Sequence, residues 1–515
     1  MPEPSQQPVL AFLADSATHH GAPVIRIDTH AACVFLAGPR ALKIKRAVRF
    51  PFLDFSTLPR RKAACDAELA INRAFAPELY RQVLPITRET DGRLALAGSG
   101  EPVEWAVEMT RFDETQTLDR LADAGRIDAA LADALGRMAA KVHADARPAT
   151  GSGFAAALAD IVAQNDKELR GSADLFDSAE VTAFTRATQI VLARVMPLLE
   201  QRERAGLVRR CHGDLHLGNI VLIAGKPVAF DAIEFDERIA TIDVLYDLAF
   251  LLMDLSARDL APAASIVLNR YLIETKRASD LDALAALPLF MATRAAIRAK
   301  VTAARRAHAP DADAAADSAR SYFALARRLI APPPPRLIAV GGLSGTGKSL
   351  LARELAAHIH PLPGAVVLRS DIERKVLFGM TETARLPPTA YTAAVTERVY
   401  AALTQKARRV LAAGHSAIVD AVFARAEERA AIESATRGAP FRGLFLTADL
   451  ATRIDRIGTR IADASDADTA VARAQEAYEL GALTWTQVDA SGPPDETLHR
   501  ALLALESGAA MRGGP

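Results

Sequence analysis

The chain has little cysteine, and its cysteines form no pattern. Cys33, Cys65 and Cys211 lie far apart, without the spacing of metal ligands. Cysteines this sparse are typical of a reducing compartment, so we expect a cytoplasmic protein without a disulfide framework or a zinc site. Residues 1–14 have no basic stretch and contain several prolines, a composition unlike that of a secretory signal.

An excess of charge of either sign is also missing. Lys plus Arg and Asp plus Glu each number 62, which gives a formal net charge of zero at pH 7. A chain without a basic surplus has no overall field that attracts nucleic acid. No apolar run is long enough to span a membrane. At 515 residues and 50% hydrophobic composition, the chain is typical of a globular protein of two or three domains.

Consecutive prolines mark the clearest domain boundary. Pro332–Pro335 cannot continue a helix and form a stiff extended spacer. The apolar run Arg336–Val340 follows at once and is typical of a buried strand. We therefore predict a first domain of residues 1–330, a linker at 331–335 and a second domain of residues 336–515.

The first predicted domain changes character along its length. Short strands are indicated at 34–36 and 41–45, whereas alanine-rich amphipathic segments at 128–144 and 288–308 predict helices. This order, strands first and helices later, indicates an α+β domain.

The strongest motif opens the second predicted domain. Residues 342–349 read Gly-Leu-Ser-Gly-Thr-Gly-Lys-Ser and lie between a predicted strand and a helix predicted at 350–358. This is the context that a phosphate-binding P-loop, the Walker A motif, requires. Backbone amides can surround phosphate oxygens, Lys348 can reach the β- and γ-phosphates, and Ser349 can ligate magnesium. The residues expected to bind ATP or GTP here are Gly342, Ser344, Gly345, Thr346, Gly347, Lys348 and Ser349.

A second strand, Ala365–Leu368, delivers an acid and an arginine to the start of the next helix. Asp371 is then placed where an acceptor hydroxyl would lie, and it can accept the proton of that hydroxyl. Arg374, one helical turn further on, can hold a substrate anion or the transferring phosphoryl group. We predict both as catalytic residues. The alternative is that Ser370 or Asp371 serves only as a helix N-cap.

Later residues can complete this site. The strand Ser416–Val419 ends at Asp420, which can order magnesium-bound water, although an ordinary strand-terminal Asp is the alternative. Arg453, Arg456 and Arg460 follow at helical-turn spacing and share a face. We expect Arg456 and Arg460 to close over ATP as a lid. A solvated helix face explains the same arginines equally well.

These motifs resemble those of small P-loop kinases of the gluconate kinase, zeta toxin and polynucleotide kinase type. The resemblance covers residues 336–491 and implies a doubly wound parallel α/β sheet. In those relatives an acid after the second strand activates the acceptor hydroxyl, and Asp371 with Arg374 matches that position.

The alternative hypothesis for the second domain is a polynucleotide 5′-hydroxyl kinase. Positive charge for a nucleic acid is present at five positions, but aromatic residues for base stacking are sparse near them. These cations are Arg369, Arg374, Lys375, Arg408 and Arg409. Nucleic acid is therefore the less favoured partner.

The first predicted domain carries an unrelated motif. Asp214 and Asn219 lie five positions apart in the segment His212–Asn219, and Asp231 follows the predicted strand Pro227–Phe230. In this order the first Asp accepts a hydroxyl proton, while the Asn and the second Asp hold magnesium on the ATP phosphates. We predict Asp214 as a catalytic base, and Asn219 and Asp231 as ligands of a hard cation.

With His-Gly-Asp at 212–214 and Asp-Ala-Ile-Glu-Phe-Asp at 231–236, this region resembles the aminoglycoside phosphotransferase and choline kinase family. The resemblance implies a protein-kinase-like domain with two lobes, a small one of about residues 1–110 and a large one of about 111–330. It also implies that the domain phosphorylates a small alcohol.

The same resemblance assigns residues of the small lobe. Lys43 would contact the α- and β-phosphates, with Glu68 as its partner, although Lys45 points to the same strand face and competes for the role. Ordinary strand-edge lysines are the alternative. The strand 103–109 would enter the hinge between the lobes, where the backbone of Glu108 and Met109 would meet adenine.

Other positions follow the family pattern less closely. Asp243 and Asp247 resemble residues that brace the catalytic loop, although acids at a helix start are equally favoured by the helix dipole. Residues 30–34 contain no glycine, where protein kinases have a Gly-rich loop, so a domain that only binds nucleotide is an alternative. His216 and Cys211 are expected to pack the loop rather than bind metal.

As a whole, the chain resembles bacterial proteins in which an aminoglycoside phosphotransferase-like domain is fused to a P-loop ATP-binding domain. The resemblance implies a bifunctional ATP- and magnesium-dependent phosphotransferase with two nucleotide sites, acting on small-molecule alcohols. The alternative from another class is a regulatory ATPase or toxin-antidote-like module whose first domain only senses nucleotide.

Overall fold

The computed structural model describes residues 5–50, 53–149, 151–306, 311–436, 438–459 and 464–510. They form two compact units. The first comprises Met1–Leu158 with Pro197–Asp254, and the second comprises Ala159–Met196 with Leu255–Pro515. The boundary predicted at 331–335 lies inside the second unit, and it stays a prediction.

The elements that precede residue 331 are α1 (Gln7–Ala14), β1 (Val24–Asp28), β2 (Ala32–Ala37), β3 (Arg40–Lys45), β4 (Arg49–Phe50), β5 (Leu53–Asp54), α2 (Leu58–Phe75), β6 (Tyr80–Arg88), β7 (Leu94–Leu96), β8 (Glu101–Thr110), α3 (Leu118–Asp123), α4 (Ala129–Asp145), α5 (Phe154–Arg170), α6 (Ser178–Arg204), β9 (Val208–Arg210), β10 (Ile220–Ile223), β11 (Lys226–Ala229), α7 (Glu237–Ala240), β12 (Thr241–Asp243), α8 (Val244–Ala257), α9 (Ala261–Thr275), α10 (Ala278–Ala283), α11 (Leu287–Arg305) and α12 (Ala312–Ile330).

The later elements are β13 (Leu337–Gly342), α13 (Lys348–Ala356), β14 (Val366–Arg369), α14 (Ser370–Leu377), α15 (Ala393–Ala412), β15 (Ala417–Asp420), α16 (Ala426–Glu433), β16 (Phe441–Thr447), α17 (Leu450–Gly458), α18 (Thr469–Ala474), β17 (Thr486–Asp489) and α19 (Pro494–Ala510).

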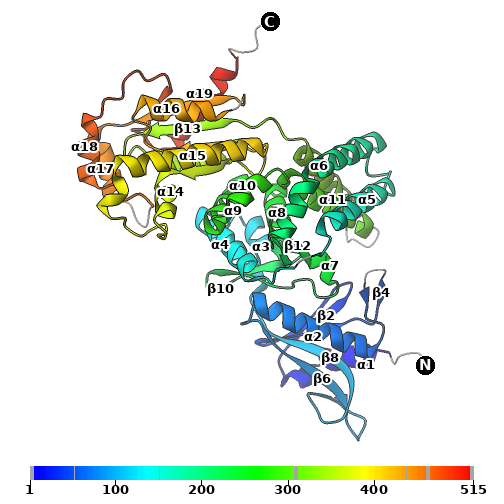
Figure 1. Ribbon diagram of the computed structural model, residues 1–515. Helices are drawn as coiled ribbons and strands as arrows, with labels where there is room; N and C mark the ends of the chain where they lie inside the picture. The colour runs from blue at the N-terminus through cyan, green and yellow to red at the C-terminus, as the bar shows by residue number, and fades with distance from the viewer. Residues whose placement is uncertain are drawn as a thin grey trace. The chain divides into compact units, whose positions relative to one another are not determined.

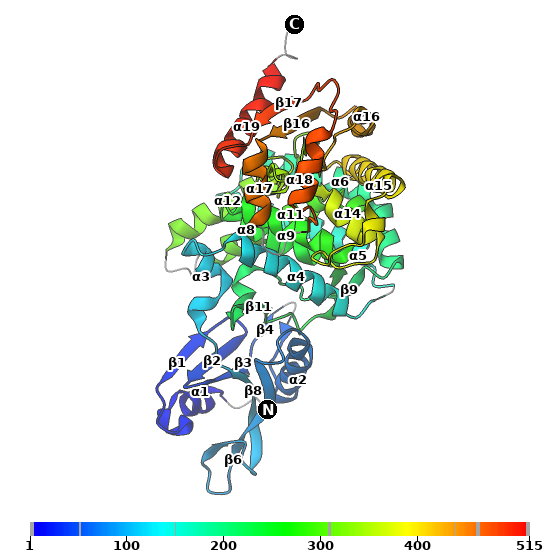
Figure 2. The same cartoon turned by 90° about the vertical axis from the view of Figure 1, so that its left-hand side faces the viewer.

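The first unit begins with an antiparallel sheet in the order β1-β2-β3-β8-β6-β7 (Figure 2). The strands predicted at 34–36 and 41–45 are confirmed as the hairpin β2–β3, which turns at Gly38 with φ +54°. Helix α2 packs against β6 and β8 (Figure 1). Phe35, Leu42 and Ile44 lie in the core of the sheet face that packs against α1. The lysines of β3 therefore emerge beside α2.

Two short hairpins follow in the same unit. β9 pairs with β12, and β10 pairs with β11. The segment 211–219 runs from β9 to β10, and residue 231 lies just after β11. The pairing of β10 with β11 therefore brings the two halves of the predicted catalytic motif close together in space.

The second unit contains a parallel sheet in the order β14-β15-β13-β16-β17. β13 is buried along its whole length, as expected for a central strand covered on both faces. Leu351 and Leu355 of α13 and Ala501 of α19 pack on one core with this sheet, while α15 contacts β14 and β15 (Figure 1). The predicted doubly wound α/β fold is confirmed, with the phosphate loop directly after the central strand.

Among the helices that the described residues form, none has both the length and the apolar character needed to cross a bilayer.

Candidate active sites

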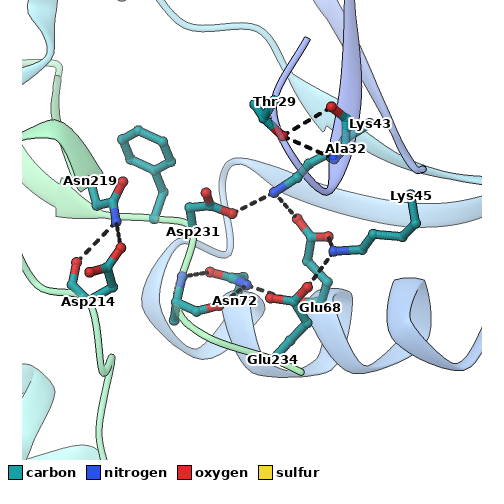
Figure 3. A network of polar contacts seen from close by, with 12 residues as sticks. Thr29, Ala32, Lys43, Lys45, Glu68, Asn72, Asp214, Asn219, Asp231 and Glu234 are labelled. Atoms are coloured by element: carbon teal, nitrogen blue, oxygen red, sulfur yellow. Dashed lines mark hydrogen bonds and ion pairs between the residues drawn. The ribbon is translucent and has the colours of Figure 1, made fainter. Parts of the chain in front are cut away.

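The predicted catalytic loop of the first unit brings two polar residues together. The Nδ2 atom of Asn219 donates to the Oδ2 atom and to the backbone oxygen of Asp214, both at 3.0 Å (Figure 3). The Asp214 side chain remains 40% exposed. The loop therefore presents a carboxylate that an acceptor can reach, and the neighbouring amide fixes its orientation.

A buried aspartate braces this loop. The carboxylate of Asp247 accepts hydrogen bonds from the backbone amides of His212, at 3.2 Å, and Gly213, at 2.9 Å. The predicted bracing role of Asp247 is confirmed. Asp243 instead forms a bidentate ion pair with Arg202, at 2.6 and 2.9 Å, and accepts the N–H of the third residue of its own turn, as helix-start acids do. Of the two alternatives left open for Asp243, these contacts favour the helix-start acid.

His212 links the two halves of the site in its neutral form. Burial lowers the pKa of His212. Its Nε2 atom lies 2.9 Å from the backbone oxygen of Phe230, and its Nδ1 atom accepts the N–H of Asp214 at 3.3 Å. One ring nitrogen donates and the other accepts, which is the pattern of a neutral imidazole.

Two lysines of β3 and three acids form a charge cluster. The Nζ atom of Lys43 lies 2.8 Å from Oε1 of Glu68 and 2.5 Å from Oδ1 of Asp231. Lys45 contacts Oε2 of Glu68 at 2.6 Å and also pairs with Glu234. Figure 3 shows both lysines converging on Glu68, with Asp231 on the side of Lys43. Of the two competing lysines, Lys43 is the one that contacts the predicted cation ligand.

Opposite charges keep Lys43 and Glu68 ionised despite their burial. Burial disfavours the charged form of Lys43, but Asp231 and Glu68 outweigh that effect and raise its pKa. Burial also disfavours ionised Glu68, and the two lysines nevertheless hold its pKa well below the usual range. The positive charge of Lys43, which would attract a phosphate, therefore lies beside the carboxylate of Asp231, which would attract a cation.

Asn72 is a site residue that the sequence analysis missed. Its Oδ1 atom accepts the N–H of Ala232 at 2.7 Å, and its Nδ2 atom donates to the Ala232 oxygen at 3.3 Å. Asp231 itself has φ +60°, in the left-handed region that non-glycine residues rarely adopt. Asn72 therefore holds the turn that presents Asp231. Its spacing of i+4 from Glu68 on one helix face is the signal that could have found it.

The strand that contains Glu108 and Met109 is paired on both sides. Leu42 of β3 is the partner of Glu108, and Tyr80 of β6 is the partner of Met109. Both residues therefore lie in a central strand of the sheet, close to its end. β8 ends at Thr110, directly after these two residues, and their contact with adenine stays a prediction.

The glycine-free turn between β1 and β2 is closed by a threonine. The Oγ1 atom of Thr29 accepts the N–H of Ala32 and donates to its backbone oxygen, each at 3.0 Å (Figure 3). A side chain thus stabilises a short turn where protein kinases place a Gly-rich loop.

Cys211 lies in a buried group of possible metal ligands. Its Sγ atom and ligand atoms of His143 and Asp247 lie within 4.8 Å of one another. Burial raises the pKa of the Cys211 thiol, which opposes the thiolate that metal binding needs. The Asp247 oxygens are also engaged by the loop amides. These contacts agree with the expectation that Cys211 packs the loop.

The phosphate loop of the second unit has conformations that require glycine. Gly345 has φ +89° and Gly347 has φ +90°, both in the left-handed region. A Cβ atom at Gly345 would lie 2.5 Å from the backbone oxygen of Arg453. The strand-loop-helix context is as predicted, and it places seven predicted residues on one segment. These are Gly342, Ser344, Gly345, Thr346, Gly347, Lys348 and Ser349.

The end of β15 meets the start of α13. The Oγ atom of Ser349 donates to Oδ2 of Asp420 at 2.6 Å, and Nε of Arg369 lies 3.4 Å from the same oxygen. Asp420 is buried. A hydroxyl and a carboxylate joined at the phosphate loop form the kind of oxygen donor set that Mg²⁺ prefers. The residues present therefore fit a magnesium ion.

Asp371 lies at the start of α14, close to this pair. Burial and the negative charge of Asp420 raise the pKa of Asp371. The alternative role as a helix cap is not supported, because the N-cap residue is Arg369 and no side chain caps this helix. Asp371 is thus a half-buried carboxylate without a capping function.

Arg374 supports a wall of the same region. Its Nη1 atom donates to the backbone oxygen of Ala390 at 2.6 Å, and its guanidinium lies 5.0 Å from the centre of the Tyr391 ring. These contacts fix the segment before α15. Ala390 and Tyr391 therefore hold the Arg374 side chain in place.

A cavity of about 1420 Å³ adjoins the phosphate loop. Asp371, Arg374 and Arg456 line it together with the segment Ser344–Ser349. Ligand sites in proteins usually occupy roughly 300–1,000 Å³. The cavity therefore has room for a nucleotide and a second molecule.

The arginines of the predicted lid helix differ in their contacts. Arg456 lines the cavity, and its guanidinium donates to the backbone oxygens of Ala490 and Gly492, at 2.7 and 2.8 Å. Arg453 is buried and its Nε atom donates to the Ser344 oxygen at 2.9 Å, so it supports the loop instead of closing over it. Arg460 lies outside the described residues.

Gln475 is a second residue that the sequence analysis missed. Its Oε1 atom accepts the N–H of Ser344 at 2.7 Å, and it lines the cavity. It lies far along the chain from the loop, in a stretch without a motif, so no signal in the sequence pointed to it.

Acids or backbone groups engage four of the five cations proposed for nucleic acid, and Arg408 donates to the Ser434 hydroxyl at 3.3 Å. Lys375 is buried and pairs with Asp466 at 2.7 Å, and Arg409 forms a bidentate contact with Asp282 at 2.9 and 2.6 Å. Arg369 lies close to Asp420. Compensated charges of this kind do not form a continuous basic surface.

Comparisons with known proteins agree with this geometry. The model of the "Phosphotransferase enzyme family" matches residues 45–287, and the model of an "AAA domain" matches residues 337–479. Uncharacterized proteins of Mycobacterium tuberculosis and Mycobacterium bovis are 31% identical over 490 residues, covering 92% of this chain and 94% of each relative. The chain belongs to the same family as these proteins. It combines a phosphotransferase domain with a P-loop domain, and the prediction of an ATP-dependent kinase is confirmed.

Two solved structures resemble parts of this chain. A choline/ethanolamine kinase family protein from Mesorhizobium loti is 15% identical, covers 63% of this chain and 98% of its own, and has a TM-score of 0.37. A gluconokinase from Sinorhizobium meliloti 1021 is 20% identical, covers 35% of this chain and 98% of its own, and has a TM-score of 0.27.

Proposed function

We propose that this phosphotransferase has two working nucleotide sites, and that each transfers the γ-phosphate of ATP to a hydroxyl of a small molecule. One observation carries the proposal. In each unit, a carboxylate lies beside residues suited to bind phosphate and a cation. These carboxylates are Asp214 and Asp371.

In the first site, Lys43 would bind phosphate oxygens, and Asn219 and Asp231 would hold magnesium. Asn219 directs its Nδ2 atom to Asp214, so Oδ1 is the atom that it can offer to a cation. Asp214 would accept the proton of the acceptor hydroxyl. Magnesium, when bound, would neutralise negative charge on the phosphates.

In the second site, the loop amides and Lys348 would hold the phosphates, and Ser349 with Asp420 would hold magnesium. Asp371 would accept the proton of the acceptor. Its raised pKa makes it a stronger base than an exposed aspartate. Arg374 and Arg456, both at the cavity wall, would add positive charge near the transferring group.

The acceptors that we propose are metabolite alcohols in the cytoplasm. The cavity is large enough for nucleotide and a small molecule together, and two of the cations that a polynucleotide would need, Lys375 and Arg409, are paired with acids. The sparse cysteines favour the cytoplasm.

The test is to incubate the full chain with labelled ATP, magnesium and a metabolite extract, and to compare wild type with Asp214→Asn and Asp371→Asn. Asp495→Asn, at an exposed position of α19, is the matched control. Loss of different phosphorylated products in the two variants is the expected result. Unchanged products in both variants would refute the proposal, and loss in only one would leave a single working site.

A further inference from the structure

Helix α9 supplies a side chain to the edge of the parallel sheet. The Nδ2 atom of Asn269 donates to the backbone oxygen of Ala365 at 3.0 Å, and its Oδ1 atom accepts the N–H of Val367 at 2.7 Å. β14 is the first strand in the order of the described sheet, so this side faces no neighbouring strand. A single side-chain amide thus makes the two hydrogen bonds that a paired strand would make.

The backbone before β14 approaches α9 very closely. Gly364 has φ +136°, and a Cβ atom there would lie 2.8 Å from Oγ of Ser265 and 2.6 Å from the backbone oxygen of Ala356. On the inner side, Nε2 of His415 lies 2.8 Å from the Gly364 oxygen. The start of β14 is therefore fixed from both sides.

Two ion pairs hold neighbouring segments to the same helical region. Arg270 of α9 contacts Glu382, in the segment after α14, at 2.5 Å. Asp282 of α10 makes a bidentate pair with Arg409 of α15. Partly exposed pairs contribute little singly, but they agree with the Asn269 contact in attaching α14, α15 and the segment between them to α9 and α10.

We propose that Asn269 is a positioning residue for the second site, which sets the register of β14 and through it the position of Asp371. α14 begins directly after β14, so a shift of the strand moves the carboxylate. Asn269 lies in the range matched by the phosphotransferase family, not in that matched by the AAA domain. A residue from the segment matched by the phosphotransferase family thus positions a residue of the second site. This inference rests on the proposed role of Asp371 as acceptor base.

The experiment compares Asn269→Leu, which keeps the side-chain size but removes both hydrogen bonds, with Asn269→Asp, which keeps an acceptor for the Val367 amide. Gln189→Ala replaces an amide at an exposed position of α6 and is the control. Amide hydrogen exchange in the full chain is measured for residues 365–371 and for β17 at the opposite edge. Turnover of the Asp371-dependent product from the metabolite extract is measured with varied ATP.

We expect Asn269→Leu to speed exchange in residues 365–371 about tenfold, as the loss of one or two hydrogen bonds predicts, and to leave β17 unchanged. We also expect kcat to fall about tenfold, because Asp371 moves relative to its acceptor, and KM for ATP to stay the same, because the phosphate loop follows β13. For Asn269→Asp we expect smaller changes in both the exchange rate of residues 365–371 and kcat.

Unchanged exchange at β14 would overturn the inference. Faster exchange with wild-type kcat would also overturn it, because Asn269 would then be structural only. If the wild type forms no Asp371-dependent product, the proposed function fails, and the exchange data still decide whether Asn269 holds β14.

Discussion

Lys43 and Asp231 form a direct ion pair, with Nζ of the lysine 2.5 Å from Oδ1 of the aspartate. Lys45, two residues further along the same strand, pairs instead with Glu234 and is almost fully buried. The acidic partners therefore distinguish the two lysines: Lys43, beside Asp231, would bind phosphate, and Lys45, beside Glu234, stabilises the cluster.

We predict that Lys43→Met lowers turnover of the Asp214-dependent product about 10²-fold or more, because it removes a positive charge at the phosphates. Lys45→Met should mainly lower the free energy of unfolding, by about 3 kcal/mol, because it leaves buried acids uncompensated. Turnover and thermal unfolding distinguish the two effects.

Lys141→Met, at an exposed position of α4, is the control for both lysine variants and should change neither property. The assignment is wrong if Lys45→Met abolishes turnover at wild-type stability while Lys43→Met keeps it.

The lysine pair also shows which site residues could be predicted from the sequence and which could not. The motifs at 212–219 and 342–349 were readable because their chemistry depends on spacing within one loop. Lys43 and Lys45 were not separable, because residues two apart on a strand share a face and only the distant Glu234 and Asp231 distinguish them. Asn72 and Asn269 act through backbone groups far away in the sequence, which no local pattern encodes.

Asp371 should give the second site a distinctive pH dependence. Burial and Asp420 raise its pKa, so on acidification it becomes protonated at a higher pH than an ordinary aspartate. Because the base must be deprotonated, kcat/KM for the Asp371-dependent product should fall on the acidic side from a pH above the usual range of an aspartate. A pH–rate profile measures this.

Asp371→Asn should reduce that turnover by about 10²–10⁴-fold and leave affinity for MgADP within about twofold, as measured by calorimetry. An acidic limb at the pH of an ordinary exposed aspartate would contradict the role of burial.

Ser349 and Asp420 should act as one unit in binding magnesium nucleotide. Their side chains are joined at 2.6 Å. We predict that Ser349→Ala and Asp420→Asn each weaken MgADP binding about tenfold or more, and that the double variant is little worse than either. Calorimetric titration of the full chain with and without magnesium measures the coupling. Additive losses would show that the two residues bind independently.

His415 should make the stability depend on pH. Burial lowers its pKa to about 4 from an ordinary value of 6.5. Above about pH 6.5 the imidazole is neutral in both states, and its contribution to stability is complete. Between about pH 6.5 and 4 the unfolded chain takes up a proton that the folded chain does not, so this contribution is lost as the pH falls. The shift corresponds to roughly 3 kcal/mol.

His415→Gln should therefore flatten the fall in unfolding free energy between about pH 6.5 and 4, as measured by urea unfolding. His499→Gln, at an exposed position of α19, should leave the slope of the wild type. Parallel curves for wild type and His415→Gln would show that His415 does not stay neutral in the fold.

Gly443 should tolerate no side chain, because an indole ring lies against it. A Cβ atom at this position of β16 would overlap the Cγ and Cδ atoms of Trp485, whose Nε1 atom donates to Glu433 at 2.6 Å. The ring cannot retreat freely, since Gly341 of β13 also lies close to it. We predict that Gly443→Ala lowers the free energy of unfolding by about 1–3 kcal/mol, as overpacked cores do.

Gly458→Ala is the matched control, because a Cβ atom there would meet nothing within 4 Å and the residue ends a helix in ordinary conformation. It should be neutral or stabilise by up to about 1 kcal/mol, since alanine favours helix more than glycine does. Thermal unfolding compares the two variants, and tryptophan emission reports the environment of Trp485. Equal stability of both variants, with unchanged emission, would mean that the Trp485 ring is free to move away from Gly443.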